Sequence, residues 1–461
     1  MLITARYVLP VSTPYIEHGA VLVREDKVVD VGPASELKLR YPDEEVRDFG
    51  MAAVMPGFVD CHSHLEYAIM RGLLNDAPYA KWKAFVLEKE ALLTEQDWID
   101  SAVLGAYEAL SAGITTVADV TSTGASLPAA ERLGLRGIIY REVGAASREQ
   151  VAPAMQSAVD QIAEWRHAST SGRFRFGIGP DSLYTCHPQI LKEVARYATD
   201  EHVPVAIHLA GSQEECDFIR YGSSPFSIAS DSETHRAFER RQALELLPAG
   251  CSPVQYALNW DILSVPEVLA IHCVKVDARD IEVLAEYGVN VAVCPRANAK
   301  LGMGVAPIVQ MQEAGITVGL GTDSPAAADS IDPIEEMRFT MLALRAVNGL
   351  KGFIQGPDMI RMATLDSARA LGMDDIVGSL DPGKQADIVA IDLSDSRQAP
   401  THFPTSAVVH TADRDNILMT MVGGRIVFDA SDKFGHVLTA DMGNMRRIVS
   451  NIEKLRKRLR S

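Results

Sequence analysis

The middle of the chain repeats one arrangement, in which a short run of apolar, β-branched residues precedes a longer stretch with helical periodicity. Strands that alternate with helices in this way are joined as parallel strands by crossover helices. Eight such runs occur, at residues 56–64, 115–120, 137–143, 175–180, 204–209, 268–274, 289–295 and 317–323. They predict a (β/α)8 TIM barrel, an α/β fold. A doubly wound open sheet would need a glycine-rich phosphate loop after its first strand, and no GxGxxG motif follows residues 56–64.

The two ends of the chain have a different character. Short strand-like segments broken by turns lie at residues 19–24 and 27–31, and again at 387–392, 406–410 and 425–428. Because they flank the barrel on both sides, we predict one small β-sandwich built from both termini. The expected domains are residues 1–56 for the first part of this sandwich, 57–366 for the barrel, and 367–461 for the second part with a basic terminal helix. That helix is amphipathic, which suits docking on the surface or, alternatively, contact with a membrane or a partner.

The composition excludes several classes of protein. Hydrophobic residues make up 47% and charged residues 23%, as in ordinary globular proteins. Lys and Arg number 44 against 61 Asp and Glu, and this net charge of −17 argues against nucleic-acid binding, which needs a basic surface. The six cysteines contain no CxxC pair, so neither a disulfide framework nor a structural zinc knuckle is predicted. Without a signal-peptide pattern or a membrane-spanning apolar run, we expect a cytoplasmic protein that acts on a small molecule, away from membranes.

Residues of the types that bind metals stand at the ends of the predicted strands. His62 and His64 end the first strand, His208 the fifth, His272 the sixth and Asp323 the eighth. Positions two apart in a strand share one side, and barrel active sites lie at the carboxyl ends of the strands. We therefore expect these five side chains to converge. Neutral imidazoles with one carboxylate suit Zn²⁺ or Fe²⁺ with a position left open for water, which favours a catalytic metal over a structural one.

The sequence around these residues resembles the amidohydrolase superfamily. The resemblance rests on MPGFVDCHSH at 55–64, IHCV at 271–274, CPRAN at 294–298, LGMG at 301–304, GLGTDS at 319–324 and LDPGKQAD at 380–387. Within the superfamily, the chain is similar to the branch that holds the deaminases of methylthioadenosine, S-adenosylhomocysteine and aminodeoxyfutalosine together with the triazine hydrolases. Two details, Glu66 and the tract at 214–226, resemble the aminodeoxyfutalosine deaminases.

The resemblance implies a metal site and a reaction. One metal ion per chain, Zn²⁺ or alternatively Fe²⁺, would be bound by His62, His64, His208 and Asp323. The metal would lower the pKa of a bound water, Asp323 and His272 would take the proton of that water, and His272 would also steady the developing oxyanion. The attacked atom would be an sp² carbon of an N-heterocycle with an amino or halide leaving group. The resemblance also implies a homo-oligomer.

Four further residues are candidates for substrate binding. Glu66 would hold ribose hydroxyls or, alternatively, orient the metal-binding histidines. Trp82 would stack on a base or belong to the core. Arg71 would shape the substrate loop or be a surface arginine. Asp181 stands where these deaminases usually have a histidine, and would accept hydrogen bonds from an amine or a cationic substrate or cap its loop.

The chain departs from the family pattern at Gly211. These deaminases usually have a glutamate three residues after the fifth-strand histidine, and it protonates a ring nitrogen as water adds. Loss of one general acid typically lowers the rate by about 10²–10⁴-fold. Glu214 and Glu215 are the candidates to replace it as proton donor, although a helix that starts there would place them in solvent.

Three functions are consistent with these residues. The first is a metal-dependent hydrolytic deaminase of an adenosine-like nucleoside or another aminoheterocycle. The second is a hydrolase of the same fold that acts on another C–N, C–Cl or C–S bond, as in halo- or alkylthio-triazines, or on a cyclic amide. The third is a binding or scaffold protein that retains the metal without turnover.

Overall fold

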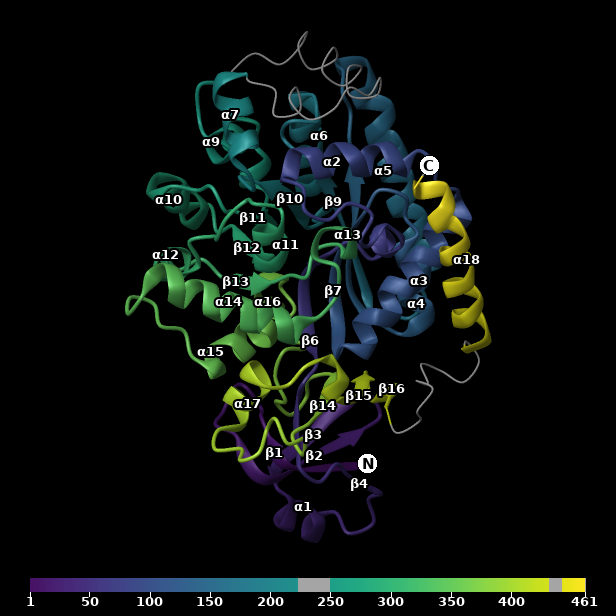
Figure 1. Cartoon of the computed structure of the whole chain (residues 1–461), viewed down its shortest axis with the longest axis vertical. Helices are drawn as coiled ribbons and strands as arrows, with labels where there is room; N and C mark the ends of the chain where they lie inside the picture. Colours follow the sequence, from purple (N-terminus) through teal and green to yellow (C-terminus); the bar gives the residue numbers. More distant parts are fainter. Residues whose placement is uncertain (223–248, 431–441, 461) are drawn as a thin grey trace.

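The computed structural model describes residues 1–222, 249–430 and 442–460, which form two sheets with their surrounding helices (Figure 1). The larger part is a barrel, and the smaller part is a mixed sheet that lies at one end of the barrel beside the N-terminus.

The barrel consists of eight parallel strands in sequential order. These are β6 (Phe58–Ser63), β7 (Ile114–Thr121), β8 (Arg136–Val143), β9 (Phe174–Pro180), β10 (Val205–Leu209), β11 (Val268–His272), β12 (Asn290–Val293) and β13 (Val318–Leu320). A parallel bridge between Ser63 and Asp323 connects the last strand back to the first. The predicted (β/α)8 barrel is therefore confirmed, and each of its expected strands overlaps an observed one.

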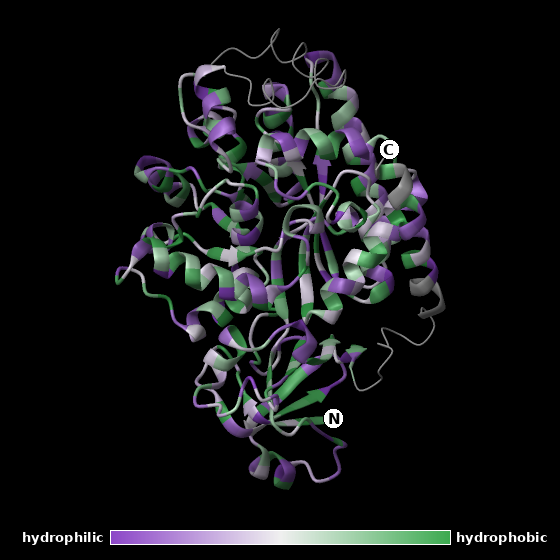
Figure 2. Cartoon of the chain, in the orientation of Figure 1, coloured by the Kyte–Doolittle hydropathy of each residue, from purple (hydrophilic) through white to green (hydrophobic). Residues whose placement is uncertain are grey.

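Side chains of the barrel strands alternate between two buried layers. In β11, Leu269 and Ile271 pack with residues of the barrel interior, whereas Val268 and Ala270 pack against the outer helices. Parallel strands with both faces covered are apolar along their whole length, which is why the sequence runs were continuous rather than alternating. The outer helices, such as α10, contain hydrophilic stretches, which are purple in Figure 2.

The helices surround the barrel, and several of them begin at capping residues. Thr94 and Asp97 form a capping box at the start of α3, and Asp277 and Asp280 form one at the start of α10. The described helices of the barrel are α2 (Tyr79–Glu90), α3 (Glu95–Ser111), α4 (Ser126–Leu133), α5 (Arg148–Ala168), α6 (Pro188–Glu201), α7 (Gln213–Tyr221), α9 (Pro253–Asn259), α10 (Ala278–Glu286), α11 (Pro295–Lys300), α12 (Ile308–Glu313), α13 (Pro325–Ala328), α14 (Pro333–Asn348), α15 (Gly356–Arg361) and α16 (Ser367–Ala370).

The second sheet takes strands from both ends of the chain, as predicted. Its order is β16-β15-β14-β5-β1-β2-β3, and β4 pairs with β1. The strands are β1 (Leu2–Val8), β2 (Ile16–Arg24), β3 (Lys27–Pro33), β4 (Val46–Asp48), β5 (Ala52–Pro56), β14 (Ile388–Asp392), β15 (Ile417–Val422) and β16 (Arg425–Asp429), with the short helix α1 (Ala34–Arg40) beside them. The pairing of β5 with β14 joins the two termini within one hydrogen-bonded sheet.

The strand predicted at residues 406–410 is wrong, because this segment is the helix α17 (Pro404–His410). Pro404 stands in its first turn, where the fixed φ of proline suits a helix. Val408 and Val409 are both buried, against the neighbouring helices α14 and α15. The β-branched run was short, and runs of that length fit either structure.

The terminal helix α18 (Met442–Arg460) lies along α3, at the side of the barrel (Figure 1). Ile448 and Leu459 are buried, and the Asn451 side chain donates a hydrogen bond to Asp100. The helix is therefore docked on the surface of the barrel, as its amphipathic sequence indicated.

A buried ion pair fastens the barrel to the second sheet. The Arg136 guanidinium, at the start of β8, donates to both carboxylate oxygens of Asp387 at 2.8 and 3.2 Å. Asp387 also accepts from the Gly423 amide at 2.7 Å, and Arg136 donates to Gln385. A bidentate pair with these further bonds fixes the angle between the two sheets at the end of the barrel opposite the predicted site.

All six cysteines are free thiols. Among the helices of the described residues, none has the length and hydropathy to cross a bilayer.

Candidate active site

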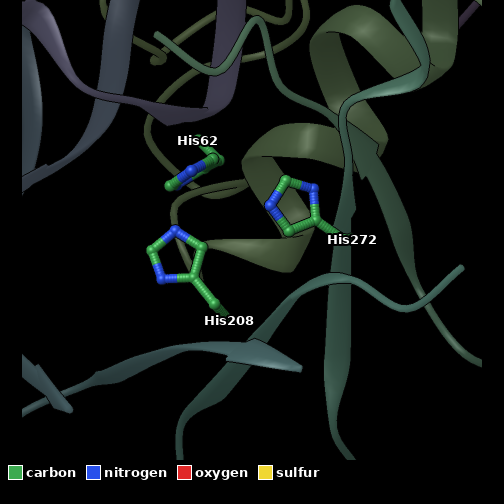
Figure 3. Close-up of side chains that lie close together, drawn as sticks. All are labelled: His62, His208 and His272. Carbon is green, nitrogen blue, oxygen red and sulfur yellow. The ribbon is translucent and has the colours of Figure 1, made fainter. Parts of the chain in front are cut away.

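The carboxyl ends of the barrel strands bring the five predicted metal-type residues together. Figure 3 shows His62, His208 and His272 with their rings directed toward one another. One ligand atom from each of these three lies within 4.8 Å of the others, and the same is true of His62, His64 and Asp323. The predicted convergence is thus observed.

Irregularities in the backbone direct these side chains into the mouth of the barrel. The register of β6 against β7 shifts between Asp60 and Ser63, at the His-Ser-His tract. His272 and Asp323 have positive φ values of 74° and 58°. Bulges re-aim side chains, and left-handed backbone at non-glycine residues clusters at functional sites. Simple strand alternation, on which the sequence prediction relied, would not have produced these directions.

Hydrogen bonds of the Nδ1 atoms fix the orientation of two of the imidazole rings. His64 Nδ1 lies 2.8 Å from the Val120 carbonyl oxygen, and His208 Nδ1 lies 3.2 Å from that of Asp181. Each Nδ1–H therefore donates, which leaves Nε2 as a lone-pair acceptor. These two Nε2 atoms are 3.3 Å apart. Two facing lone pairs at this distance repel each other unless a cation lies between them.

The His62 ring supplies a further observation that fits a cation. Both of its ring nitrogens are buried and have no hydrogen-bond partner among the described residues. Its Nε2 lies 3.9 Å from Asp323 Oδ1. Unpartnered buried polar atoms are rare in folded proteins, and here they face other ligand-type groups. The donor set of imidazole nitrogens and one carboxylate oxygen therefore fits Zn²⁺ or Fe²⁺.

Burial keeps these imidazoles in the form that binds a metal. The pKa values of His62 and His208 lie well below the usual value, because burial and the neighbouring imidazoles disfavour the charged ring. A neutral ring is the form of histidine that coordinates metals.

Two buried carboxylates that the sequence did not single out hold the strand ends in place. Asp60 accepts from the Thr322 amide at 2.9 Å and from its hydroxyl at 2.6 Å, and burial raises the pKa of Asp60 to about 7. Asp119 accepts from Ser63 and from the Leu65 amide at 2.7 Å, and burial raises its pKa to about 8. They link the loops that carry the metal-type residues.

A pocket opens above these residues. Its apolar and aromatic walls come from α2, the loop after β9 and the loop after β12, and its polar groups are mainly acidic. Besides the metal-type residues, it is lined by Tyr67, Tyr79, Trp82, Lys83, Val86, Glu142, Asp181, Ser182, Tyr184, Leu301, Met303 and Ser324. The predicted substrate-binding residues Trp82 and Asp181 are thus at the pocket, and the Trp82 indole donates to the Ala326 carbonyl at 3.2 Å.

Lys83 is a pocket residue that sequence reasoning missed. Its ammonium nitrogen lies 3.6 Å from Asp181 Oδ1. Burial alone would lower the pKa of Lys83, but the acidic groups around it, Asp181 first among them, hold the pKa well above the usual value. The only signal in the sequence was its place beside Trp82 on the helix after the first strand.

The structure places Glu66 beside the loop after β7 and not among the residues that line the pocket, and its role toward ribose hydroxyls stays a prediction. The residue is fully buried and does not line the pocket. Its carboxylate accepts from Thr121 Oγ1 at 2.6 Å, from Ser122 N at 2.9 Å and Oγ at 3.2 Å, and from the amide and hydroxyl of Thr123. Glu66 therefore binds the loop after β7.

Arg71 is likewise not among the residues that line the pocket, and its role in shaping the substrate loop stays a prediction. It forms an ion pair with the buried carboxylate of Glu108, which also pairs with Arg414 at 3.0 Å. The alternative interpretation of Arg71 as a structural arginine fits this arrangement.

The two candidate replacements for the missing glutamate also lie outside the pocket. Glu215 is buried and accepts from the amides of Ala210 and Gly211 at 3.0 and 2.8 Å, in the first turn of α7. Glu214 is half-buried on the same helix. Neither is among the residues that line the pocket, and the role of one of them as proton donor stays a prediction.

The fold and the site together define a metal-dependent hydrolase barrel. The model of the amidohydrolase family matches residues 53–427, and the chain belongs to this family. A 5-methylthioadenosine/S-adenosylhomocysteine deaminase of Symbiobacterium thermophilum is 31% identical over 417 residues, which cover 90% of this chain and 89% of the relative. A protein of the same name from Desulforudis audaxviator is 31% identical and covers 96% and 95%.

Solved structures share the fold over nearly the whole chain. An adenosine deaminase from Xanthomonas campestris with bound zinc has a TM-score of 0.84 at 24% identity, and covers 100% of this chain and 98% of that one. An atrazine chlorohydrolase from Arthrobacter aurescens complexed with zinc has a TM-score of 0.82 at 24% identity, and covers 98% and 99%. These comparisons confirm the predicted family, and the predicted class of activity, a hydrolytic deaminase, agrees with the names of the relatives.

Proposed function

We propose that this protein is a metal-dependent hydrolytic deaminase of an adenosine-like nucleoside or a related aminoheterocycle. The observation that carries the proposal is the convergence of four imidazoles and one carboxylate at the floor of an aromatic pocket. The relatives named as nucleoside deaminases support the same class of substrate.

His62, His64, His208 and Asp323 would hold one metal ion, Zn²⁺ or alternatively Fe²⁺. When bound, the metal supplies a Lewis acid that lowers the pKa of a water molecule toward neutrality. Asp323 and His272 take the proton of the attacking water and pass it to the leaving amine. His272 also stabilises the oxygen on which negative charge develops.

The walls of the pocket position a flat ring. Tyr79 and Trp82 are stacked, with ring centroids 6.2 Å apart and an angle of 29° between the planes. Their faces suit a heterocycle. Asp181 accepts a hydrogen bond from Thr185 at 2.8 Å and retains acceptor capacity for an amino group of the substrate.

The test is ammonia release by metal-loaded protein from adenosine, methylthioadenosine, S-adenosylhomocysteine, aminodeoxyfutalosine, guanine and melamine, with the product identified by mass. We expect turnover of at least one compound, with an amino group replaced by oxygen. Metal-loaded protein that releases no ammonia from the panel contradicts the proposal. Loss of chloride or alkylthiol from triazines instead would favour the second predicted function.

The cytoplasmic location, the homo-oligomeric state, the absence of nucleic-acid binding and the domain boundaries at residues 56 and 366 stay predictions.

A further inference from the structure

The addition of water to an amino-substituted ring carbon requires two proton transfers. One proton leaves the attacking water, and the acceptors for it are Asp323 and His272. A second proton must reach the ring nitrogen beside the attacked carbon, because that nitrogen becomes basic as water adds. A donor for this second proton has to line the pocket.

The backbone at Gly211 faces the pocket but brings no side chain to it. A Cβ atom at this position would lie 3.4 Å from His272 Cδ2 and 2.9 Å from the end of the Met303 side chain. Both His272 and Met303 line the pocket. Glu214 and Glu215 are not among the lining residues, so in the described part of the chain the segment after β10 brings no acid to the pocket.

Lys83 lines the pocket from α2, and its position is fixed by neighbouring contacts. Its helix α2 is fixed to the barrel by the hydrogen bond from Trp82 to the Ala326 carbonyl. The Lys83 side chain is 19% exposed, and its nitrogen faces Asp181 at 3.6 Å. Lys83 is the one ammonium group among the described residues that line the pocket.

Lys83 lines the same pocket as the metal-type residues His64, His208, His272 and Asp323. A substrate bound over these residues therefore shares the pocket with the Lys83 ammonium group. Lys83 pairs with Asp181 at 3.6 Å, and this acid holds the pKa of Lys83 above its usual value, so the ammonium form persists throughout the neutral range.

We propose that Lys83 donates the proton to the ring nitrogen of the substrate. The inference rests on the proposed deaminase function. As the water oxygen bonds to the ring carbon, one water proton passes to Asp323 or His272, and an ammonium proton of Lys83 passes to the ring nitrogen. The exocyclic C–N bond then breaks, and ammonia leaves with the proton held by the base. The hydroxyl proton lost as the carbonyl forms replaces the one that Lys83 gave.

Two other acids in the pocket are less suited to this step. Asp181 accepts from Thr185 through one oxygen and faces Lys83 with the other. Glu142 lies near the end of β8, which is two strands away from β6 and two strands away from β10, the nearest strands with proposed metal ligands. It also lines a neighbouring cavity. Burial, and next the charge of Asp181, raise the pKa of Glu142 to about 8, which makes it the competing donor.

The experiment compares Lys83→Ala and Lys83→Arg with the matched control Lys81→Ala, whose residue is exposed on the same helix. We expect both Lys83 variants to lose at least about 100-fold in kcat. Their KM and zinc content should stay near the wild-type values, because Lys83 is not among the metal-type residues. Added methylamine should raise the rate of Lys83→Ala and leave that of Lys81→Ala unchanged.

Lys83→Arg separates proton donation from charge, since a guanidinium keeps the charge but does not give up its proton. A Lys83→Arg variant with the wild-type rate would overturn the inference. So would a full rate in Lys83→Ala together with a large loss in Glu142→Gln. Wild-type protein without any deaminase activity would overturn the proposed function itself, and this inference with it.

Discussion

Replacement of Glu66 by alanine separates a structural role from substrate binding. The carboxylate accepts bonds from the buried Thr121 hydroxyl at 2.6 Å and from the Ser122 amide at 2.9 Å, whereas Thr123 is exposed and its groups can bond to water instead. Hydrogen bonds to a charged group contribute about 1.5–3 kcal/mol each, so these two bonds give a loss of about 3–6 kcal/mol in the free energy of unfolding.

The assay is urea unfolding of metal-stripped protein followed by circular dichroism, which avoids stabilisation by the metal. KM is measured in parallel on metal-loaded protein. Glu66→Ala should be strongly destabilised with KM changed by less than about threefold, and the exposed Glu88→Ala should match the wild type in both measurements. A Glu66→Ala protein of wild-type stability with KM raised more than about tenfold would refute the reasoning and return Glu66 to the substrate.

Two further predictions concern buried charges. Asp387→Ala leaves the Arg136 guanidinium buried without its partner, and should lower the free energy of unfolding by about 3–5 kcal/mol in urea titrations; a loss below about 1 kcal/mol would contradict the role of this pair. Burial raises the pKa of Glu215 to about 7 from 4.5, so the folded chain binds this proton more tightly than the unfolded chain. As the pH rises from about 4.5 to 7, Glu215 should therefore lower the stability of the wild type by up to about 3 kcal/mol, and Glu215→Gln should lack this share of the decrease while the shares of Asp60 and Asp119 remain. Thermal midpoints of metal-stripped protein at pH 5 and 8 test this, and equal pH dependence of the two proteins would disprove it.

The barrel could be predicted because its strands are buried on both faces. Such strands are continuous apolar runs, and their spacing by helical stretches fixes the topology. The metal-type residues followed from their positions at the ends of these runs. The segment at 406–410 could not be assigned, because a short β-branched run fits a strand or a helix until its packing is known.

The substrate-binding residues were harder to predict than the metal site. Glu66 and Lys83 are both charged and both follow the first strand, but Glu66 is directed into a loop and Lys83 into the pocket. Their directions depend on how the segment 65–90 is laid across the barrel mouth. That placement is set by contacts such as the one from Trp82 to Ala326, which lies 244 residues away in the sequence.

The central claim is that one metal ion held by His62, His64, His208 and Asp323 drives the deamination. Its most direct test is the rate of ammonia release, from the best substrate of the panel, as zinc is added back to metal-stripped protein and bound zinc is measured in the same samples. We predict no activity without metal, a rate proportional to bound zinc up to one ion per chain, and neither binding nor activity in His208→Ala. Full activity in the metal-stripped protein, or wild-type zinc binding by His208→Ala, would contradict the account.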